Sequence, residues 1–259
     1  MGTVYLAEHR ELRRKVALKV IRPERLWSDV ARQRFWREAK AVARLDHPWI
    51  CPVYEVGEWR GQPFMAMRYV EGRTVAELIE EAREARRTGT TSSDSDTQLG
   101  TGRKRIDTWV ALFEKVALAL QAAHEQGIVH RDIKPANIIV TDQGEPVILD
   151  FGLAYDEESE QAGLTMTGDQ PGTPMFMSPE QVDPGGRRLD ATTDVWSLGV
   201  SLYECLCLER AFAGTSLREI PDPVLESPPV PLTPPALSSP PAPANAPRHS
   251  PRRTRHPLP

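Results

Sequence analysis

Two short segments constrain the fold and chemistry of this chain more than any other part of its sequence. Residues 130–137 read HRDIKPAN, and residues 150–152 read DFG. Between them lie two apolar runs, 138–140 and 147–149, around an Asp-Gln-Gly turn, and this pattern predicts a short β-hairpin. An amphipathic helical pattern precedes the first segment. The sequence therefore predicts a loop and a hairpin that bring several charged residues together.

These charged residues match what phosphoryl transfer from ATP requires. The reaction asks a protein to position an alcohol, to bind Mg²⁺ through oxygen atoms and to neutralise phosphate charge. Asp132 can accept the alcohol proton, and Lys134 can follow the transferring phosphate. Asn137 and Asp150 offer the hard oxygen ligands that Mg²⁺ prefers. Asp132 alone could cap a turn and Asn137 alone could belong to a loop, but the whole set predicts a site for ATP and Mg²⁺.

With these motifs the chain resembles a protein kinase of the bacterial eukaryotic-like (Hanks-type) serine/threonine class, from Gly2 to about Phe212. Residues 16–19, VALK, resemble the third strand of that family. The resemblance implies that Lys19 holds the α- and β-phosphates of ATP, and that Glu38 pairs with Lys19 and orients its ammonium group. Read alone, Glu38 could equally lie on a solvated helix face.

The resemblance also implies an adenine site between two lobes. Residues 62–72 resemble the fifth strand and the hinge, with Met67 beside the adenine; as strand core, Met67 would fit equally well. The backbone of residues 68–70 would pair with the adenine edge. The residues that the resemblance assigns to nucleotide binding are Gly2, Val4, Ala17, Lys19, Met67, Arg68, Tyr69, Val70, Ile139 and Asp150.

Residues 172–174, GTP, and residues 178–180, SPE, resemble the end of the family's activation segment. The family usually has Ala where Ser178 stands. Thr173 resembles the threonine that contacts the catalytic Asp and Lys, and together with Lys134 it indicates Ser/Thr rather than Tyr substrates. The catalytic set that the resemblance implies is Asp132, Lys134, Asn137, Lys19, Glu38 and Thr173, with Asn137 and Asp150 as metal ligands.

Two further features of the resemblance concern regulation and support of this site. Arg131 precedes the catalytic Asp and can pair with a phosphate of about two negative charges, so phosphorylation of the activation segment is expected to order it. Thr165 and Thr167 are the expected acceptors, unless they are plain polar loop residues. Asp194 resembles the helix residue that anchors the backbone of the catalytic loop.

We expect an α+β, two-lobed kinase-like fold, with a small β-rich N-lobe and a mainly helical C-lobe. Residues 28–45 show apolar residues at helical spacing, and Asp107 is expected to cap a helix that buries Val110, Phe113, Ala117 and Leu120 and ends at Gly127. Strands are expected at 3–7, 15–21, 53–57 and 64–67, the last two as a hairpin around Arg60-Gly61, and another helix at 74–86.

Both ends of the kinase-like region depart from the family pattern, so we expect the fold to be incomplete there. At the start, the chain matches only the last glycine and the valine of the family's Gly-x-Gly-x-x-Gly-x-Val loop. At the other end, residues 221–259 hold 14 of the 24 prolines, which excludes packed helices there. The predicted division is a kinase domain at 1–214 (N-lobe about 1–69, C-lobe about 70–214), a low-complexity insertion at about 87–105, and a Pro-rich, disordered tail at 215–259.

The bulk composition fits one globular unit and excludes several classes of partner. The chain has 259 residues, a formal net charge of −4 and 40% hydrophobic residues, which gives no argument for nucleic acid. Cys51, Cys205 and Cys207 show no metal-ligand spacing and indicate reduced, buried thiols and a cytoplasmic location. No apolar run reaches the roughly 18 residues of a spanning helix, so no membrane segment is expected.

The function predicted from these residues is an ATP- and Mg²⁺-dependent serine/threonine protein kinase, activated by autophosphorylation of its activation loop. Its expected partners are ATP, proteins with Ser/Thr acceptors, and a second copy of the chain for autophosphorylation. The alternative is a catalytically weak or inactive fragment that acts as an interaction protein through runs such as Pro228-Pro229-Val230-Pro231, in polyproline conformation. A plain disordered tail, or out-of-frame sequence, explains these runs more simply.

Overall fold

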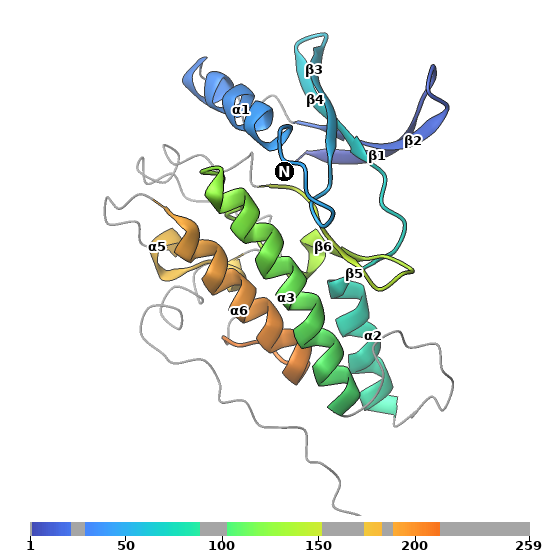
Figure 1. Ribbon diagram of the computed structural model, residues 1–259, viewed down its shortest axis with the longest axis vertical. Coiled ribbons are helices and arrows are strands. Elements are labelled where there is room, and N and C mark those ends of the chain that lie inside the picture. Colours follow the sequence, from blue (N-terminus) through green and yellow to red (C-terminus); the bar gives the residue numbers. More distant parts are fainter. Residues whose placement is uncertain (1, 22–28, 89–102, 152–173, 183–188, 213–259) are drawn as a thin grey trace, which may run out of the picture.

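The chain folds into two lobes, which Figure 1 shows for the computed structural model of the protein. The structure describes residues 2–21, 29–88, 103–151, 174–182 and 189–212. One lobe is a β-sheet with a single helix beside it, and the other is built mainly from three long helices. The predicted α+β, two-lobed architecture is confirmed. Thr165, Thr167, Thr173, the core of the predicted insertion and the Pro-rich tail lie outside the described residues.

The N-lobe sheet is antiparallel and has the strand order β1-β2-β4-β3. Every second side chain of β4 is buried, namely Pro63, Met65 and Met67, because successive side chains of a strand point to opposite faces. The predicted hairpin turns at Arg60 and Gly61, whose φ angles of 50° and 81° suit a two-residue turn of type I′. All four strands were predicted, and their bounds are β1 Thr3–His9, β2 Arg14–Val20, β3 Val53–Trp59 and β4 Gln62–Arg68.

Helix α1 (Asp29–Val42), predicted at residues 28–45, packs its apolar side against this sheet. Phe35 and Ala39, one turn apart, are only 2% and 0% exposed, and they share a core cluster with Met65 and Met67 of β4. Glu38 precedes Ala39 on this helix, so the packing of α1 determines which cations Glu38 can reach.

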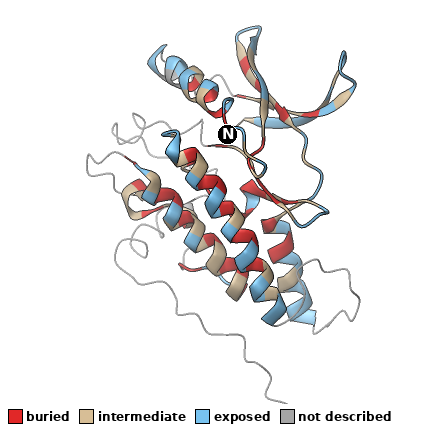
Figure 2. Cartoon of the chain, in the orientation of Figure 1, coloured by how far each residue is buried: buried red, intermediate tan, exposed pale blue. Residues whose placement is uncertain are grey.

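Three helices, α2 (Val75–Thr88), α3 (Arg103–Glu125) and α6 (Ala191–Cys207), form the C-lobe and bury the faces that they turn toward one another (Figure 2). α2 and α3 extend into the predicted insertion from both sides. None of the described helices is long and apolar enough to cross a membrane.

The expectation for α3 was wrong in two respects. The helix begins at Arg103, so Asp107 lies within it and is not its cap. Of the four residues expected to be buried, Phe113 and Leu120 are, whereas Val110 is 49% exposed and Ala117 is exposed as well. α3 is apolar on more than one side, and the stripe that carries its large aromatic side chains is the one that packs into the core. That stripe comprises Trp109, Leu112, Phe113, Val116, Ala119, Leu120 and Ala123.

A second, three-stranded sheet lies between the lobes and frames the predicted catalytic loop. Its strands are β5 (Arg73–Thr74), β6 (Ile138–Val140) and β7 (Pro146–Ile148), in the order β5-β6-β7. β6 and β7 are the predicted hairpin. The segment that follows α1 joins this sheet, since the Cys51 amide donates to the Ile148 carbonyl at 2.9 Å. The N-lobe and the catalytic hairpin are therefore linked through backbone hydrogen bonds.

The C-terminal end of α6 is held by arginines from the other two helices. Arg83 of α2 pairs with Glu204 at 2.7 Å, and its Nε donates to the Leu208 carbonyl at 2.9 Å. Arg86 of α2 and Arg105 of α3 donate to the carbonyls of Cys207 and Leu206. The last carbonyls of a helix have no partner within it, and cations near them interact favourably with the helix dipole. These contacts therefore fix α6 against α2 and α3.

The three cysteines are free thiols, as predicted. Cys51 and Cys205 are buried, whereas Cys207 is partly exposed, so the expectation of burial holds for two of the three. Burial raises the pKa of the Cys51 thiol to about 12, which keeps it neutral and weakly nucleophilic.

Local sequence signals fix the start of α2 and the end of α3. Thr74 and Glu77 form a capping box at the start of α2, in which the Thr74 amide donates to Glu77 Oε2 at 2.8 Å and the Glu77 amide donates to Thr74 Oγ1 at 3.2 Å. α3 ends in a Schellman motif, in which the amides of Gly127 and Ile128 donate to the carbonyls of His124 and Ala123. Gly127 has a φ of 73°, which explains why the predicted stop at this residue is a glycine.

Replacing Gly127 by alanine should lower the free energy of unfolding by about 1–2 kcal/mol, because the left-handed conformation is strained for a residue with a Cβ. Gly199→Ala is a matched control within α6, where a Cβ would meet no atom within 4 Å. It should raise the free energy of unfolding by about 0.5–1 kcal/mol. Urea unfolding followed by circular dichroism measures both, and a Gly127→Ala variant as stable as wild type would contradict the left-handed helix end.

Candidate active site

Asp132 lies in the loop between α3 and β6, and residues of the same loop hold its carboxylate. The Lys134 ammonium group donates to both carboxylate oxygens, at 3.0 Å to Oδ1 and 2.8 Å to Oδ2. The Asn137 amide donates to Asp132 Oδ2 at 3.1 Å and to the Asp132 carbonyl at 2.7 Å. The 3₁₀ turn η2 (Pro135–Asn137) returns the chain toward Asp132. Three groups that the sequence predicted to act together thus lie within hydrogen-bonding distance.

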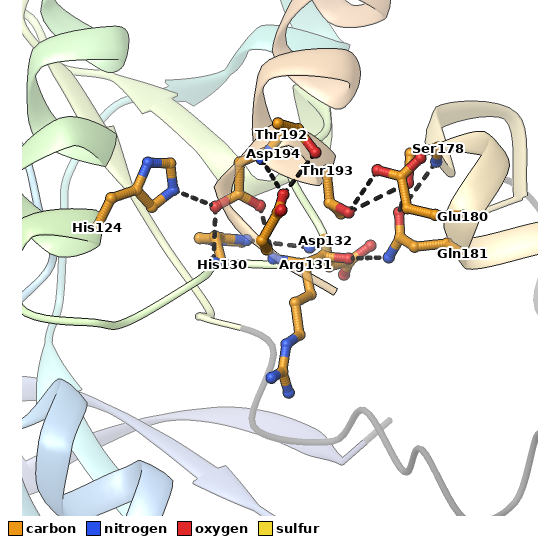
Figure 3. Close-up of polar contacts among 11 residues, drawn as sticks. His124, His130, Arg131, Asp132, Ser178, Glu180, Gln181, Thr192, Thr193 and Asp194 are labelled. Atoms are coloured by element: carbon orange, nitrogen blue, oxygen red, sulfur yellow. Dashed lines mark hydrogen bonds and ion pairs between the residues drawn. The ribbon is translucent and has the colours of Figure 1, made fainter. Parts of the chain in front are cut away.

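Asp194, at the start of α6, holds the backbone of this loop (Figure 3). Its side chain is 0% exposed, and its Oδ1 accepts the Arg131 amide at 2.7 Å. Its Oδ2 accepts the His130 amide at 2.8 Å and the Nε2–H of His124 at 2.7 Å. Arg131 has a φ of 65°, a conformation that costs a residue with a Cβ about 1–2 kcal/mol. The hydrogen bonds to Asp194 offset that strain and keep the loop in its bent form, as the resemblance implied.

His130 connects the catalytic loop with the segment that carries Asp150. The imidazole is fully buried, and its Nε2 donates to the Leu149 carbonyl at 2.8 Å. Its Nδ1 accepts the Asp132 amide at 3.2 Å, so the hydrogen bonds require the neutral Nε2–H tautomer. The ring also packs against Phe151, with centroids 4.6 Å apart. His130 therefore sets the spacing between the two motifs.

The two predicted metal ligands lie at the same end of the β6–β7 hairpin. Asn137 precedes β6 and Asp150 follows β7, and the Leu149 amide donates to the Asn137 carbonyl at 2.8 Å. Lys19 of β2 reaches this place, with its Nζ 2.9 Å from Asp150 Oδ1. The N-lobe lysine and the C-lobe carboxylate are therefore already in contact.

These residues fit Mg²⁺ in the form in which it accompanies a nucleotide. Mg²⁺ takes few protein oxygens and keeps waters and phosphate oxygens as its other ligands. Asn137 and Asp150 supply one amide oxygen and one carboxylate. Elsewhere among the described residues, no group of three or more His, Cys, Asp or Glu side chains could form a complete protein cage for a metal.

The position of Glu38 differs from the expectation. Lys19 pairs with Asp150, whereas Glu38 Oε1 accepts a hydrogen bond from the Arg131 guanidinium at 3.4 Å. The Lys19–Glu38 ion pair that the resemblance implied is not formed in this structure. The reason is geometric, since the Arg131 side chain extends from the catalytic loop toward α1 and meets the Glu38 carboxylate there.

The residues predicted to surround the adenine come from both lobes. Ala17 and Met67 are register partners on β2 and β4, and Met67 is 5% exposed. Val4 on β1 is 54% exposed, and Ile139 on β6 is half-buried. In the hinge, the Arg68 amide donates to the Pro52 carbonyl at 3.0 Å. The Arg68 amide is thus already engaged. The Arg68 carbonyl accepts from Cys51 Sγ at 3.4 Å and keeps a second lone pair that can accept from an adenine. Tyr69 and Val70 continue the hinge.

Gly2 approaches the neighbouring strand so closely that no other residue fits. A Cβ on Gly2 would lie 2.1 Å from the Val20 carbonyl oxygen. The resemblance assigned Gly2 to nucleotide binding as the last glycine of the family's loop, and the structure gives a packing reason for a glycine at this position.

A buried polar network joins the catalytic loop to the short helix α5 (Pro179–Val182), as Figure 3 shows. The Gln181 side chain donates through Nε2 to the Arg131 carbonyl at 2.8 Å. Its Oε1 accepts the Ser178 amide at 3.0 Å. Thr193 of α6 donates to Glu180 Oε1 at 2.8 Å and lies 3.2 Å from Ser178 Oγ. Among the described residues, no arginine or lysine pairs with Glu180.

Sequence reasoning did not single out Gln181 or His124. Gln181 follows the SPE motif directly, and His124 lies six residues before His130 near the end of α3. Neither position carries a charge or spacing that indicates a role. Their contacts arise only when α3, α5 and α6 meet around the catalytic loop.

Asp194→Ala should lower the free energy of unfolding by roughly 2–6 kcal/mol, since it leaves two buried amides unsatisfied at about 1–3 kcal/mol each. Asp190→Ala is the control on the same helix. Asp190 is an exposed N-cap whose carboxylate accepts the Thr192 amide at 2.8 Å, and its loss should destabilise the fold much less, because water can satisfy the amide that it leaves. Urea unfolding measures the free energy of unfolding of both variants. An equal decrease in the two would contradict the anchoring role of Asp194.

Comparison with known proteins agrees with this geometry. The family model described as "Protein kinase domain" matches residues 1–227. The chain is 34% identical to the probable serine/threonine-protein kinase SCO3848 of Streptomyces coelicolor, over 83% of this chain and 30% of that protein. It is also 34% identical to the serine/threonine-protein kinase PknD of Mycobacterium tuberculosis, over 85% of this chain and 30% of that protein. The chain thus spans about a third of the length of these curated relatives.

Solved structures give the same result for the fold. The crystal structure of a single-substitution mutant of the Mycobacterium tuberculosis PknI kinase domain is similar to this chain with a TM-score of 0.60 and 28% identity, over 82% of this chain and 71% of that one. A double mutant of the same domain gives a TM-score of 0.60 and 26% identity, over 82% of this chain and 72% of that one. The match of the family model, the identity to bacterial relatives and the two-lobed fold lead to one conclusion: the chain belongs to the protein kinase family, among the bacterial serine/threonine kinases of Hanks type.

Proposed function

We propose that this chain transfers the γ-phosphate of ATP, in the presence of Mg²⁺, to Ser/Thr hydroxyl groups of proteins. The observation that carries the proposal is the meeting of five functional groups at one place. Asp132, Lys134 and Asn137 are hydrogen-bonded together, and the Lys19–Asp150 pair lies at the end of the adjoining hairpin. The relatives named as serine/threonine kinases support the same acceptor class.

In the proposed reaction, Asp132 accepts the proton of the substrate hydroxyl as its oxygen bonds to the γ-phosphorus. The bond between that phosphorus and the β–γ bridging oxygen breaks, and ADP leaves with the electron pair. Asp132 suits this role because Lys134 and Asn137 fix the carboxylate by hydrogen bonds, which reduces the freedom lost in reaching the transition state.

The cations of the site neutralise the charge of the phosphates. Lys134 can exchange its contact with Asp132 for the transferring phosphoryl group, and Lys19 can hold the α- and β-phosphates from the N-lobe side. Asn137 and Asp150 would hold Mg²⁺, which supplies further positive charge to the phosphate oxygens when bound. Gly2, Val4, Ala17, Met67, Ile139 and the backbone of Arg68, Tyr69 and Val70 would form the adenine and phosphate contacts.

We further propose that phosphorylation of Thr165 or Thr167 activates the chain by competing for Arg131. A phosphate of about two negative charges attracts a guanidinium more strongly than one carboxylate does. Drawing Arg131 away from Glu38 would free Glu38 to pair with Lys19, the arrangement implied by the family resemblance. Autophosphorylation between two copies of the chain, and contact of Thr173 with Asp132 and Lys134, belong to the same proposal.

A role as an interaction protein through the Pro-rich tail stays a prediction, since residues 215–259 lie outside the described part of the chain. The intact set of polar groups around Asp132 favours catalysis as the first function to test.

Asp132→Asn should lower the rate of autophosphorylation by roughly a hundredfold or more, because general-base groups commonly contribute about 10²–10⁴ to a rate. Labelled ATP with Mg²⁺ measures this rate.

Asp150→Asn should abolish activity and also the Mg²⁺-dependent thermal stabilisation by nucleotide, whereas Asp132→Asn should keep that stabilisation. Asp142→Asn, in the exposed β6–β7 turn, is the control and should behave as wild type. Full activity of Asp132→Asn would contradict the proposed mechanism.

Activation is tested by mapping the label by mass spectrometry, which should place it on Thr165 or Thr167. The double variant Thr165→Ala, Thr167→Ala should phosphorylate a protein substrate roughly tenfold more slowly, the scale of a coupling of about 1–3 kcal/mol. A control that removes the same number of hydroxyls is Ser92→Ala, Ser93→Ala. Wild-type activity in the threonine variant would show that this chain needs no activation-segment phosphate.

A further inference from the structure

We infer that Gln181 is a positioning residue for Asp132. Gln181 holds the carbonyl of the peptide group that joins Arg131 to Asp132, and thereby couples the substrate-facing end of the activation segment to the catalytic carboxylate. The inference rests on the proposed kinase function, but its structural part can be tested without activity.

The contact is made in the interior and leaves the side chain little freedom. Gln181 is 2% exposed, and its Nε2 donates to the Arg131 carbonyl at 2.8 Å. The other end of the amide accepts the Ser178 amide at 3.0 Å and lies 3.4 Å from Ser178 Oγ. Both ends of the side-chain amide are thus engaged, which fixes its orientation and directs a donor at the catalytic loop.

The peptide group between Arg131 and Asp132 is consequently held on both sides. Its carbonyl accepts from Gln181, and its N–H donates to His130 Nδ1 at 3.2 Å. The preceding two amides are bound by Asp194. The backbone at Arg131 is strained, with a φ of 65°, so the peptide next to it keeps its orientation only while its polar atoms are bonded. Rotation would turn the Asp132 side chain away from Lys134 and Asn137.

The network also explains how α5 keeps its place. Two consecutive residues of α6 bond its two neighbours: Thr193 bonds Glu180 of α5, and Asp194 bonds the catalytic loop. Gln181 closes the triangle by joining α5 directly to the loop (Figure 3). A change in α5, which follows the segment that ends in residues 172–174, is therefore transmitted to Asp132 through one hydrogen bond rather than through α6 alone.

Gln181→Met tests the inference, because methionine has nearly the same shape and lacks the donor. We expect kcat for a peptide substrate to fall about ten- to a hundredfold, the scale of a small misplacement of a catalytic group. The KM for ATP should stay within about twofold of wild type, since other elements bind the nucleotide. Gln181→Glu should lower kcat at least as much, because a carboxylate oxygen would then face the Arg131 carbonyl. Gln121→Met, which alters an exposed glutamine on α3, is the control.

Hydrogen–deuterium exchange of the peptide covering residues 128–137 gives a readout that does not need activity. Gln181→Met should speed exchange of the Asp132 amide about tenfold, the scale of losing roughly one hydrogen bond, while Gln121→Met leaves it unchanged. Unaltered exchange in folded Gln181→Met would overturn the inference. If the wild type is active, a Gln181→Met variant with the same kcat as the wild type would overturn it as well. If the wild type shows no kinase activity, the proposed function fails, and the exchange result still decides the positioning role.

Discussion

The arrangement of the predicted catalytic residues depends on one buried carboxylate, that of Asp194. It receives three donors from two segments of the chain while it is itself fully shielded from water. A buried charge is costly unless such donors surround it, so the loop and α6 stabilise each other. The left-handed turn at Arg131 depends on these bonds, and Gln181 of α5 adds a further bond to the same loop.

The fold was predictable from sequence where a pattern has one physical meaning. Alternating strands, the Arg60-Gly61 turn and the Gly127 helix end came out as expected, because strand periodicity and positive φ leave few alternatives. The buried face of α3 was predicted only in part: Phe113 and Leu120 are buried as expected, but the helix has more than one apolar stripe, and only packing in the C-lobe core buries Trp109 rather than Val110.

The site shows the same division. Asp132, Lys134, Asn137 and Asp150 could be placed from their spacing, since a short loop and a two-stranded hairpin bring them together by local geometry. The partner of Glu38 could not, because α1 is positioned by the sheet and Arg131 by Asp194, and the two meet only in the assembled lobes. Gln181 was missed for a related reason: an uncharged side chain acquires its role from what surrounds it.

The arginines at the C-terminal end of α6 have a consequence for how this architecture tolerates change. Arg86 lies near the end of α2 and Arg105 near the start of α3, and both reach carbonyls at the end of α6. The two ends of the connection between α2 and α3 are therefore fixed by α6 and not by the length of the connection itself. Since the entropy of closing a loop grows only slowly with its length, residues can be added or removed between these anchors at little cost to the fold. The α2–α3 connection is thus a natural insertion point for a reporter peptide or a further domain, well away from the β6–β7 end where the catalytic groups meet.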